Sequence, residues 1–446
     1  MGWGSLWEAS PWNHHDFWWK DWLPFCQGVR TPLAITPALP TTPTSRQLNH
    51  PVDNIVIVGG GFAGLYTALA LAGQKRHPPI LLIEPQDRFL FLPLLYELLS
   101  GELRSWEIAP RYDDLLAGRG IAWLQDRVER IDPSEHRIHT RGGRTIGYSR
   151  LVLATGAVTN TFGVPGADQH AMGFRSLGDV ERLHQLLQRM RKDRHPLQRL
   201  AIVGAGPTGV ELACKLADLV GDCAVIELIE QGGTHLPQAK AFNREQALMA
   251  LQRKDVRLRT HTRVMEVTPD GLTLRHTPQG LGSQDEEFLS AGGVIWTAGL
   301  QFLPPGMASL PPTSPDGRLI CRQDLGLEAD DHIFVAGDLA HLNAPENDNP
   351  SESRLPATAQ VAFQQAPLLA MNLLRSLEGK PLEAFRWNDL GEMMSLGVGE
   401  ACLCGSGLTL AGPAAYQLRR LAYLTRLPGL PHQMRVAAGW MADWTP

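Results

Sequence analysis

The sequence predicts an α/β protein with two Rossmann-like dinucleotide-binding domains, one inserted in the other. The main observation is a pattern that occurs twice: an apolar strand, a G-x-G-x-x-G turn and an apolar helix, at IVIVGGGFAG (residues 55–64) and at LAIVGAGPTG (residues 200–209). A second apolar strand follows each copy and ends in a glutamate, Glu84 or Glu230, which comes 25 or 26 residues after the first glycine of its motif. Because chance glycines would not repeat this spacing, we expect two dinucleotide sites of one design.

Each glycine of the first copy has a physical role. Gly59 allows a tight turn, Gly61 lets a pyrophosphate approach the backbone, and Gly64 lets the helix pack on the strand. The helix N-terminus offers unpaired N–H groups to phosphate, and Glu84 can accept hydrogen bonds from a ribose. With 44 glycines in 446 residues, the glycine pattern alone arises about 0.4 times per chain by chance, so the flanking strand, helix and acid carry the prediction. The predicted cofactor-binding residues are Gly59, Gly61, Phe62, Ala63, Gly64 and Glu84 in the first copy, and Gly204, Gly206, Gly209 and Glu230 in the second.

Composition and charge limit the possible partners. A content of 43% hydrophobic and 20% charged residues is ordinary for a globular chain with a large core. The net charge of −5 gives no basic footprint for nucleic acid, and we expect no such partner. Residues 401–446, however, carry four arginines and one acidic residue, and this basic tail favours contact with an anionic surface.

The six cysteines have neither zinc-ligand spacing nor a short-range disulfide framework. This pattern predicts no metal site and favours a reducing compartment. The C-x-C pair Cys402 and Cys404 lies in an apolar, glycine-rich stretch, where small buried thiols are expected.

We expect four parts along the chain. Residues 1–50 hold six of the twelve tryptophans and a Pro/Thr-rich stretch, which predicts a poorly ordered extension or a segment that adheres to a membrane interface. Residues 288–315 carry no charge, but repeated Gly and Pro predict buried strand and loop instead of a membrane span. The predicted parts are the extension at 1–50, a first nucleotide domain at 51–165 and 326–385, an inserted second domain at 166–325, and a C-terminal region at 386–446.

Several linked motifs resemble the two-dinucleotide-binding flavoprotein oxidoreductases, and within them the type II NAD(P)H:quinone oxidoreductases. The resemblance covers about residues 51–385, and the stretch LPLLYELLSGELRSWEIAP is most similar to the cyanobacterial and plastid demethylphylloquinone reductase branch. The other motifs are GGGFAGL with Glu84, LVLATGA at 151–157, GAGPTGVE with Glu230, GGVIWTAGL at 292–300, FVAGDLA at 334–340 and ATAQVAFQQA at 357–366.

This resemblance implies cofactors and site residues. FAD is expected in the first cradle and NADH or NADPH in the second, with Thr155, Gly156 and Asp338 near the FAD. A helix that begins near Pro356 is expected to face the flavin with its N-terminus, where the helix dipole would stabilise negative charge. The expected catalytic residues are Gln360 and Gln364, one helical turn apart at the quinone pocket, and Glu211 near the nicotinamide and quinone.

The electron acceptor is predicted from what the chain lacks. A disulfide reductase needs a cysteine pair beside its flavin, and neither C-x-x-C nor C-x-x-x-x-C occurs. A sulfide:quinone reductase also needs cysteines there, and Cys321 is the only strand candidate in the right half. A quinone therefore remains the best-supported acceptor. The resemblance implies a membrane quinone of the naphthoquinone or plastoquinone type, reduced without proton pumping; a non-catalytic redox sensor remains the alternative from another class.

The C-terminal region predicts an amphipathic surface segment. Ala414, Leu418, Leu421 and Leu424 recur at helical spacing, while Arg419, Arg420 and Arg426 are expected toward the flanks or the other face. With Trp440 and Trp444 further on, this favours a segment that lies on a membrane, although a homodimer interface would bury the same stripe. We therefore expect a peripheral membrane protein on the cytoplasmic or stromal face of a thylakoid or plasma membrane.

Overall fold

A computed structural model describes residues 54–193, 198–277, 286–307, 311–342 and 355–442. All described residues belong to one compact unit. The expectations for residues 1–50 and for Trp444 lie outside the described residues. No helix in the described part of the chain is long and apolar enough to cross a membrane.

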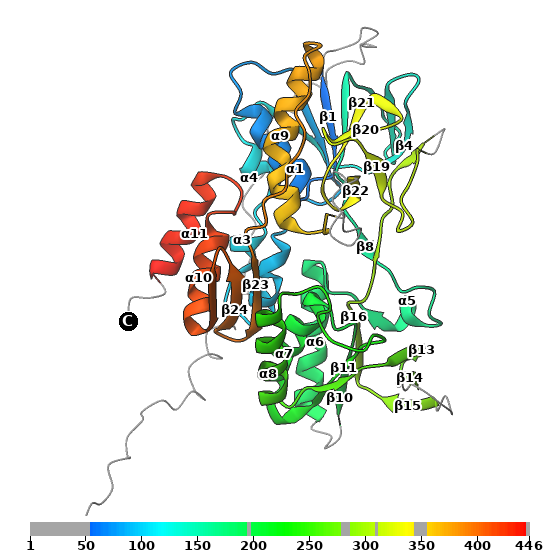
Figure 1. Cartoon of the computed structure of the whole chain (residues 1–446), viewed down its shortest axis with the longest axis vertical. Coiled ribbons are helices and arrows are strands. Elements are labelled where there is room, and N and C mark those ends of the chain that lie inside the picture. The colour runs from blue at the N-terminus through cyan, green and yellow to red at the C-terminus, as the bar shows by residue number, and fades with distance from the viewer. Residues whose placement is uncertain (1–53, 194–197, 278–285, 308–310, 343–354, 443–446) are drawn as a thin grey trace, which may run out of the picture. The chain divides into compact units, whose positions relative to one another are not determined.

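The first sheet has eight strands in the order β22-β19-β20-β21-β7-β1-β2-β3. Its centre is the predicted strand β1, in which all four residues are buried because β2 and β7 flank it in parallel and helices cover it. Helix α1 packs directly against α9 (Figure 1). The strands are β1 (Ile55–Val58), β2 (Ile80–Ile83), β3 (Ile121–Leu124), β7 (Arg150–Leu153), β19 (Leu319–Cys321), β20 (Gly326–Leu327), β21 (Asp330–Val335) and β22 (Ala340–Leu342).

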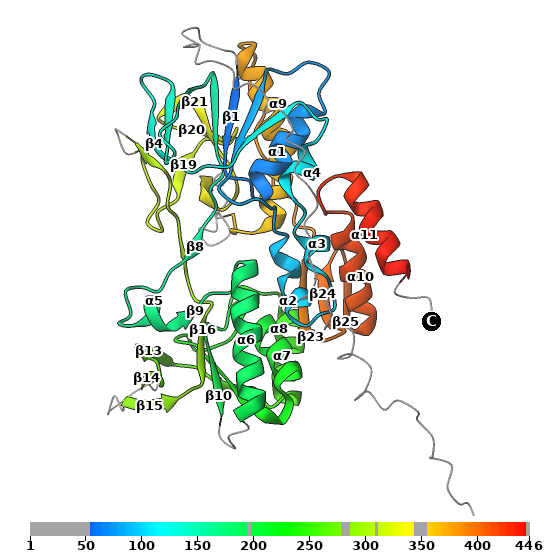
Figure 2. The ribbon, with the colours of Figure 1, turned by 180° about the vertical axis from the view of Figure 1, so that it is seen from behind.

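Short helical segments follow β2 and lead toward the second domain. They arise in the apolar stretch after Glu84 and are mostly buried; seen from behind, α2 lies beside α6 (Figure 2). The helices of this half are α1 (Phe62–Ala72), η1 (Leu92–Leu94), α2 (Leu95–Leu99), α3 (Ser105–Ile108), α4 (Tyr112–Leu116), η3 (Gly337–Leu339) and α9 (Ala359–Leu377).

The second domain repeats the design around β10, which is flanked in parallel by β11 and β16. Its five strands run in the order β12-β11-β10-β16-β9, and a three-stranded antiparallel sheet, β13-β14-β15, accompanies them. The strands are β9 (Ala171–Met172), β10 (Arg199–Val203), β11 (Val225–Ile229), β12 (Arg257–Arg259), β13 (Thr262–Thr268), β14 (Gly271–His276), β15 (Glu286–Ser290) and β16 (Gly293–Trp296). The helices are α5 (Ala167–His170), α6 (Leu177–Asp193), α7 (Pro207–Val220), η2 (Gly221–Cys223) and α8 (Ala241–Arg253). Two sheets of one design, in an α/β fold, are what the repeated motif predicts.

The return to the first domain comes earlier than residue 326. β17 (Leu300–Gln301) pairs with β8 (Val158–Thr159), and β18 (Gly306–Met307) pairs with β4. β19 already belongs to the first sheet. We therefore propose that the inserted domain ends near residue 299. The four-stranded sheet β18-β4-β5-β6 includes β4 (Val128–Asp132), β5 (Arg137–Thr140) and β6 (Thr145–Gly147).

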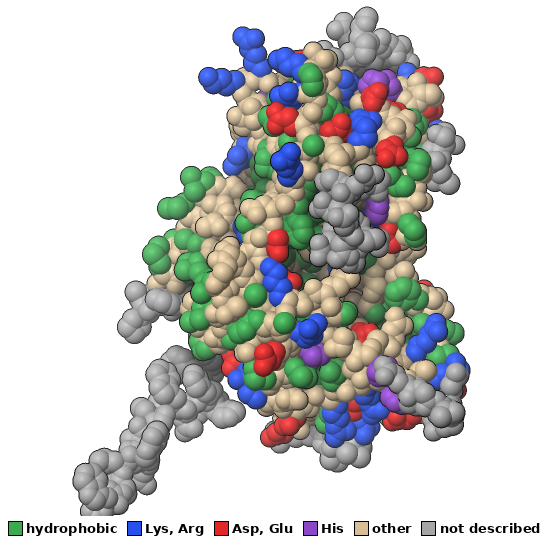
Figure 3. Space-filling model, viewed as in Figure 1, with side chains coloured by type: hydrophobic (Ala, Val, Ile, Leu, Met, Phe, Trp, Pro, Cys, Tyr) green, Lys and Arg blue, Asp and Glu red, His purple; other side chains and the backbone are tan. Residues whose placement is uncertain are grey.

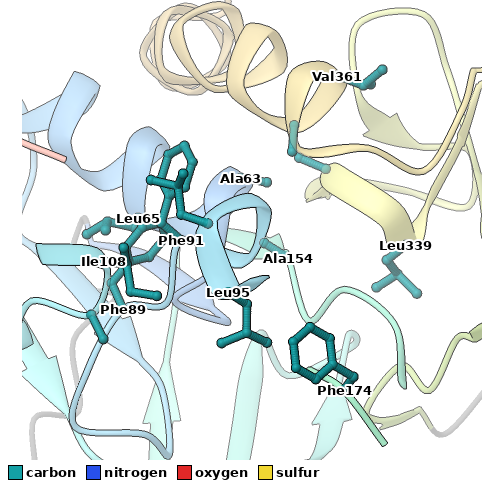
Figure 4. Close-up of a cluster of buried hydrophobic side chains, with 14 of the residues drawn as sticks. Ala63, Leu65, Phe89, Phe91, Leu95, Ile108, Ala154, Phe174, Leu339 and Val361 are labelled. Atoms are coloured by element: carbon teal, nitrogen blue, oxygen red, sulfur yellow. The ribbon is translucent and has the colours of Figure 1, made fainter. Parts of the chain in front are cut away.

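One hydrophobic core extends from the first domain into the start of the second domain. Figure 4 shows Phe89, Phe91 and Ile108 grouped near Leu65 of α1, with Leu95 of α2 facing Phe174. All of these side chains are buried. The core therefore continues from the first sheet to the segment that begins the second domain.

The C-terminal region forms a small antiparallel sheet and two helices. β23 packs against α7 and α8, and α10 packs against β24 and β25 (Figure 1). Its elements are β23 (Glu392–Gly397), β24 (Glu400–Gly405), β25 (Leu408–Gly412), α10 (Pro413–Leu424) and α11 (Leu430–Ala442). The described part of this region, up to residue 442, is thus packed against the second nucleotide domain.

Candidate active site

The first glycine motif forms a tight turn, and a side chain at Gly59 or Gly64 would clash with the backbone around it. Gly59 has φ +102°, and a Cβ there would lie 2.4 Å from the carbonyl oxygen of Ala154. A Cβ on Gly64 would lie 1.8 Å from the carbonyl oxygen of Gly59, so this glycine lets α1 reach the turn. Gly61 caps α1 and has no atom within 4 Å of its Cβ position, which leaves open space at the helix N-terminus. That space is where a pyrophosphate would meet the N–H groups.

Glu84 closes the first cradle from the end of β2. One carboxylate oxygen accepts from the N–H of Gly60 at 2.7 Å and the other from the N–H of Gln86 at 2.9 Å. Burial raises the pKa of Glu84, and these two N–H groups oppose that rise. The sequence reasoning missed Tyr112, whose hydroxyl donates to the carbonyl of Gly60 at 2.7 Å. Tyr112 lies on α4, and no local motif marks it.

The second cradle has the same geometry. Gly204 has φ +101°, and a Cβ on Gly209 would lie 1.9 Å from the carbonyl oxygen of Gly204. Gly206 caps α7 and has open space at its Cβ position, as Gly61 does. Glu230 accepts from the N–H of Ala205 at 2.9 Å and from that of Gly232 at 2.7 Å. Two equivalent cradles therefore exist in one chain.

Further predicted residues converge on the first cradle. The backbone N of Thr155, which precedes Gly156, would lie 3.0 Å from a Cβ on Gly59. Gly337, just before Asp338, has φ +73°, and its Cβ position lies 3.1 Å from the methyl of Ala63. Figure 4 shows the neighbouring Ala63, Ala154, Leu339 and Val361 around this point. Burial raises the pKa of Asp338, and the charges of Arg175 and Arg318 oppose it.

These observations fit FAD in the first cradle. An open helix N-terminus, a carboxylate at the end of the second strand and Asp338 in η3, just after β21, meet the needs of phosphate, ribose and ribityl groups. Phe62 begins α1, and its ring contacts the rings of Phe89 and Phe91 at 5.3 and 5.1 Å between centroids. It packs the side of the cradle instead of filling its opening.

Helix α9 begins three residues later than predicted. Pro356 lies outside the helix, which starts at Ala359 with Thr358 as its N-cap; the Thr358 hydroxyl accepts from the N–H of Val361 at 3.4 Å. A proline disfavours a helical conformation in the residue before it, but Pro356 itself does not determine where α9 begins. A capping threonine two residues on does so, and the sequence reasoning did not use it.

The two predicted glutamines hold a segment of the C-terminal region that we call the strap, residues 387–391. Gln360 donates to the carbonyl of Gly391 at 3.1 Å and accepts from the indole N–H of Trp387 at 3.3 Å. Gln364 donates to the carbonyl of Asn388 at 2.9 Å and accepts from its N–H at 3.1 Å. The polar atoms of both amides are therefore bonded to the strap.

An open groove lies beside these glutamines. It has a volume of 360 Å³ and runs between α9 and the segment that precedes the strap. Its lining residues are Phe363, Gln364, Pro367, Leu368, Ala384, Phe385 and Arg386. The groove is mostly apolar, with one basic side chain at Arg386.

Glu211 lies in the second turn of α7, apart from the glutamines, and it is buried. Its carboxylate accepts from the N–H of Ser395 on β23 at 2.8 Å. The guanidinium of Arg419 on α10 comes within 3.7 Å of the same oxygen. Burial raises the pKa of Glu211 to about 7, and the Arg419 charge opposes that rise. A buried carboxyl that titrates near neutrality suits proton transfer.

Arg419 was expected at the flanks of its helix or on the face opposite the leucine stripe, and it lies on the buried face of α10. Its side chain is 1% exposed and donates to the carboxylate of Glu97, whose side chain is 0% exposed. This face of α10 packs against β24, and α2 supplies the acid that Arg419 contacts. Sequence reasoning missed Glu97 because an acid inside an apolar run gave no sign of its partner.

The described cysteines do not support thiol chemistry. All five, at 214, 223, 321, 402 and 404, have free thiols. Burial raises the pKa of the Cys321 thiol to about 12, so it would be protonated at neutral pH. Within the described residues, no group of three His, Cys, Asp or Glu side chains could hold a metal ion.

The comparison with known proteins decides the family. The family model for pyridine nucleotide-disulphide oxidoreductases matches residues 53–366. The chain belongs to this family. Within it, the chain is a member of the type II NAD(P)H:quinone oxidoreductases, because quinone oxidoreductases of this kind are similar to it over 80% or more of their own length.

Two relatives and one solved structure illustrate the similarity. The chain is 38% identical over 402 residues to a demethylphylloquinone reductase of Synechocystis, covering 87% of this chain and 97% of that one. It is 36% identical to the alternative NAD(P)H-ubiquinone oxidoreductase C1 of Arabidopsis thaliana, covering 87% and 80%. The structure of NDH2 from Plasmodium falciparum with NADH superposes with a TM-score of 0.74 at 18% identity, covering 88% and 99%, and supports the family fold.

Proposed function

We propose that this family member takes two electrons from NADH or NADPH and delivers them to a membrane quinone, without pumping protons. The observation that carries the proposal is the presence of two complete cradles, one at Gly59 to Gly64 and one at Gly204 to Gly209, in a chain similar to quinone reductases. One cradle alone would fit a simple dehydrogenase, whereas two allow a resident flavin and a nicotinamide substrate to meet.

The chain's own residues would hold the two nucleotides. The N-terminus of α1 and the carboxylates of Glu84 and Asp338 would bind FAD, and the N-terminus of α7 with Glu230 would bind the nicotinamide nucleotide. Bound FAD would supply the chemistry that accepts an electron pair from the nicotinamide and passes it to the quinone. The N-terminus of α9, which meets the first cradle beside Gly337, would stabilise negative charge there.

A quinone is the acceptor that the site favours. The described thiols are unpaired and the Cys321 thiol is held protonated by burial, so neither a dithiol relay nor sulfide chemistry has support. The apolar groove at Gln364 would admit a quinone between α9 and the segment that precedes the strap. We infer that Gln360 and Gln364 act by holding the strap and that Glu211 provides a proton for the reduced quinone.

The membrane face of this enzyme is proposed to lie on α10 and α11. Hydrophobic side chains gather over these two helices in Figure 3. The exposed ones are 40 to 68% exposed: Leu418, Leu421, Leu430, Met434 and Met441. Arg420 stacks on Trp440 at 4.3 Å from guanidinium to ring centroid, which places a cation and an indole beside the apolar side chains. Such a surface suits the interface of an anionic membrane.

Placing charge on this face is expected to release the protein from membranes. The double variant Leu421→Glu with Met434→Glu should lose binding to vesicles of equal parts neutral and anionic phospholipid, because each glutamate would enter the apolar interface. Vesicle co-sedimentation measures binding, and flavin absorbance shows that FAD is retained. Phe288→Glu, on the exposed face of β15, is the matched control and should bind as the parent does. If the double variant still binds but changes its mass in solution, the face is a dimer interface instead.

We predict a preference for NADH over NADPH. The Glu230 carboxylate would meet a 2′-phosphate as like charge, and residues 231–234 contain no Lys or Arg. Arg259 lies near Glu230 in space, since its carbonyl accepts from the N–H of Glu230, but its guanidinium is held by Glu227 and Glu287 at 2.8 and 2.9 Å. Steady-state kcat/KM with naphthoquinone and benzoquinone acceptors measures this preference and the quinone choice together. A kcat/KM for NADPH equal to that for NADH would contradict this preference. The variant Glu230→Gln should reduce the difference in kcat/KM between the two nucleotides.

A further inference from the structure

A buried arginine links three parts of the chain that are far apart in sequence. Arg419 of α10 donates through Nη1 to Oε1 of Glu97 on α2, and through Nη2 to the carbonyl of Pro93 at 2.6 Å. Nη2 also lies 3.7 Å from Oε1 of Glu211 on α7. The first domain, the second domain and the C-terminal region thus meet at one guanidinium.

The two carboxylates share this guanidinium unequally. Glu97 receives a direct charge-assisted hydrogen bond, whereas the contact to Glu211 is too long for one. Oε2 of Glu97 and Nε of Arg419 are buried without a hydrogen-bond partner. A buried charge without a partner is costly, so Arg419 and Glu97 each stabilise the charged form of the other. Glu211 is left with the weaker, longer contact to Arg419.

The other groups that face Glu211 are polar or neutral. From β23 the N–H of Ser395 donates to it, and from α2 the Tyr96 hydroxyl makes a further hydrogen bond. The Cys402 thiol on β24 and the Tyr423 hydroxyl on α10 also interact electrostatically with Glu211. Burial raises the pKa of the thiol and of the hydroxyl. Among the described groups that influence Glu211 most strongly, Glu97 and Arg419 are therefore the charged ones.

We propose that Glu97 is a positioning residue that draws Arg419 away from Glu211 and so keeps the Glu211 carboxyl able to carry a proton at neutral pH. This inference rests on the proposed role of Glu211 in the delivery of a proton to the reduced quinone. In this account, the way in which Glu97 and Glu211 share the Arg419 guanidinium determines whether the Glu211 carboxyl is protonated.

The direction of the effect follows from the charges. Burial raises the pKa of Glu211 to about 7, the Arg419 charge opposes the rise, and the Glu97 charge adds to it. The change Glu97→Gln removes a like charge and leaves Arg419 with Glu211 as its carboxylate partner. Both consequences favour ionised Glu211, so its titration midpoint falls.

The test is an infrared titration of the flavin-loaded enzyme. The carbonyl band of protonated Glu211 is assigned by its loss in Glu211→Gln, and in Glu97→Gln by comparison with the variant that carries both changes. The midpoint of this band is expected to fall by about one pH unit or more in Glu97→Gln, as for a carboxyl that gains a cation partner. An unchanged midpoint would overturn the inference.

Two further variants separate this role from a structural one. Asp179→Asn is the matched control, because Asp179 is a buried acid that pairs with Arg182 within its own helix, α6, and its change should leave the midpoint in place. Glu97→Gln with Arg419→Met removes both charges, which a fold tolerates better than one, and its midpoint should rise above that of Glu97→Gln. Equal midpoints in these two Glu97 variants would show that Arg419 is not the agent.

The same samples distinguish the inference from the proposed function. The pH profile of quinone reduction should shift in the same direction as the infrared midpoint. If the infrared midpoint moves and the rate profile does not, the positioning role of Glu97 stands and the proton-delivery role of Glu211 fails.

Discussion

Replacing Gly64 by alanine is expected to abolish FAD binding. A Cβ at this position would lie 1.8 Å from the carbonyl oxygen of Gly59, so α1 could not reach the turn that presents its N–H groups. The backbone cannot yield without moving β1 or α1, both of which are buried in the first sheet's core. The measurement is the flavin-to-protein absorbance ratio of the purified variant, which should approach zero.

Gly61→Ala provides the matched control. No atom lies within 4 Å of its Cβ position, so the fold should be kept, and only the approach of a pyrophosphate should suffer. We expect this variant to purify folded and to bind added FAD more weakly than the parent. Full flavin content in Gly64→Ala would contradict the assignment of FAD to this cradle.

The second large effect is expected at Glu211. The change Glu211→Gln keeps the size of the side chain and its acceptor for the N–H of Ser395, but the amide cannot carry a proton. We expect turnover with NADH and quinone to slow at least about tenfold, within the range of lost general acid catalysis, while FAD content stays normal. Stopped-flow absorbance should place the loss in the reoxidation of the flavin by quinone.

An unchanged rate would reduce Glu211 to a structural acid. Its position in the second turn of α7 would then be explained by the helix dipole, which is worth about 0.3 to 1 kcal/mol. Such a small term would appear in a thermal unfolding curve and not in turnover. The two outcomes are therefore separable with one purified variant.

The cradles could be predicted from sequence because their determinants are local. A buried apolar strand, glycines at Gly59 and Gly204 and a carboxylate two dozen residues later are read directly from the chain, and the structure places both acids on loop N–H groups. The fold class and family followed from the same motifs. The end of the inserted domain did not, because the uncharged stretch 288–315 carries no sign of which sheet its strands join.

The contacts of Arg419 with Glu97 and Glu211 could not be predicted because these residues are distant in sequence. Glu97 and Arg419 are 322 residues apart, and each alone looks like a stray charge in an apolar helix. The same holds for Gln360, whose amide was expected to face a quinone but binds the strap at Gly391. Periodicity left Arg419 at the flanks or on the face opposite the leucines, and only tertiary packing decides whether its guanidinium meets water or an acid.

The most direct test of the proposed function is anaerobic mixing of the FAD-loaded enzyme with NADH, followed by a soluble naphthoquinone. The flavin absorbance should bleach when NADH is added and return when the quinone is added, with one quinone reduced for each NADH oxidised. A flavin that NADH does not bleach, or that stays bleached in the presence of the quinone, would contradict electron transfer from the second cradle through the first to a quinone.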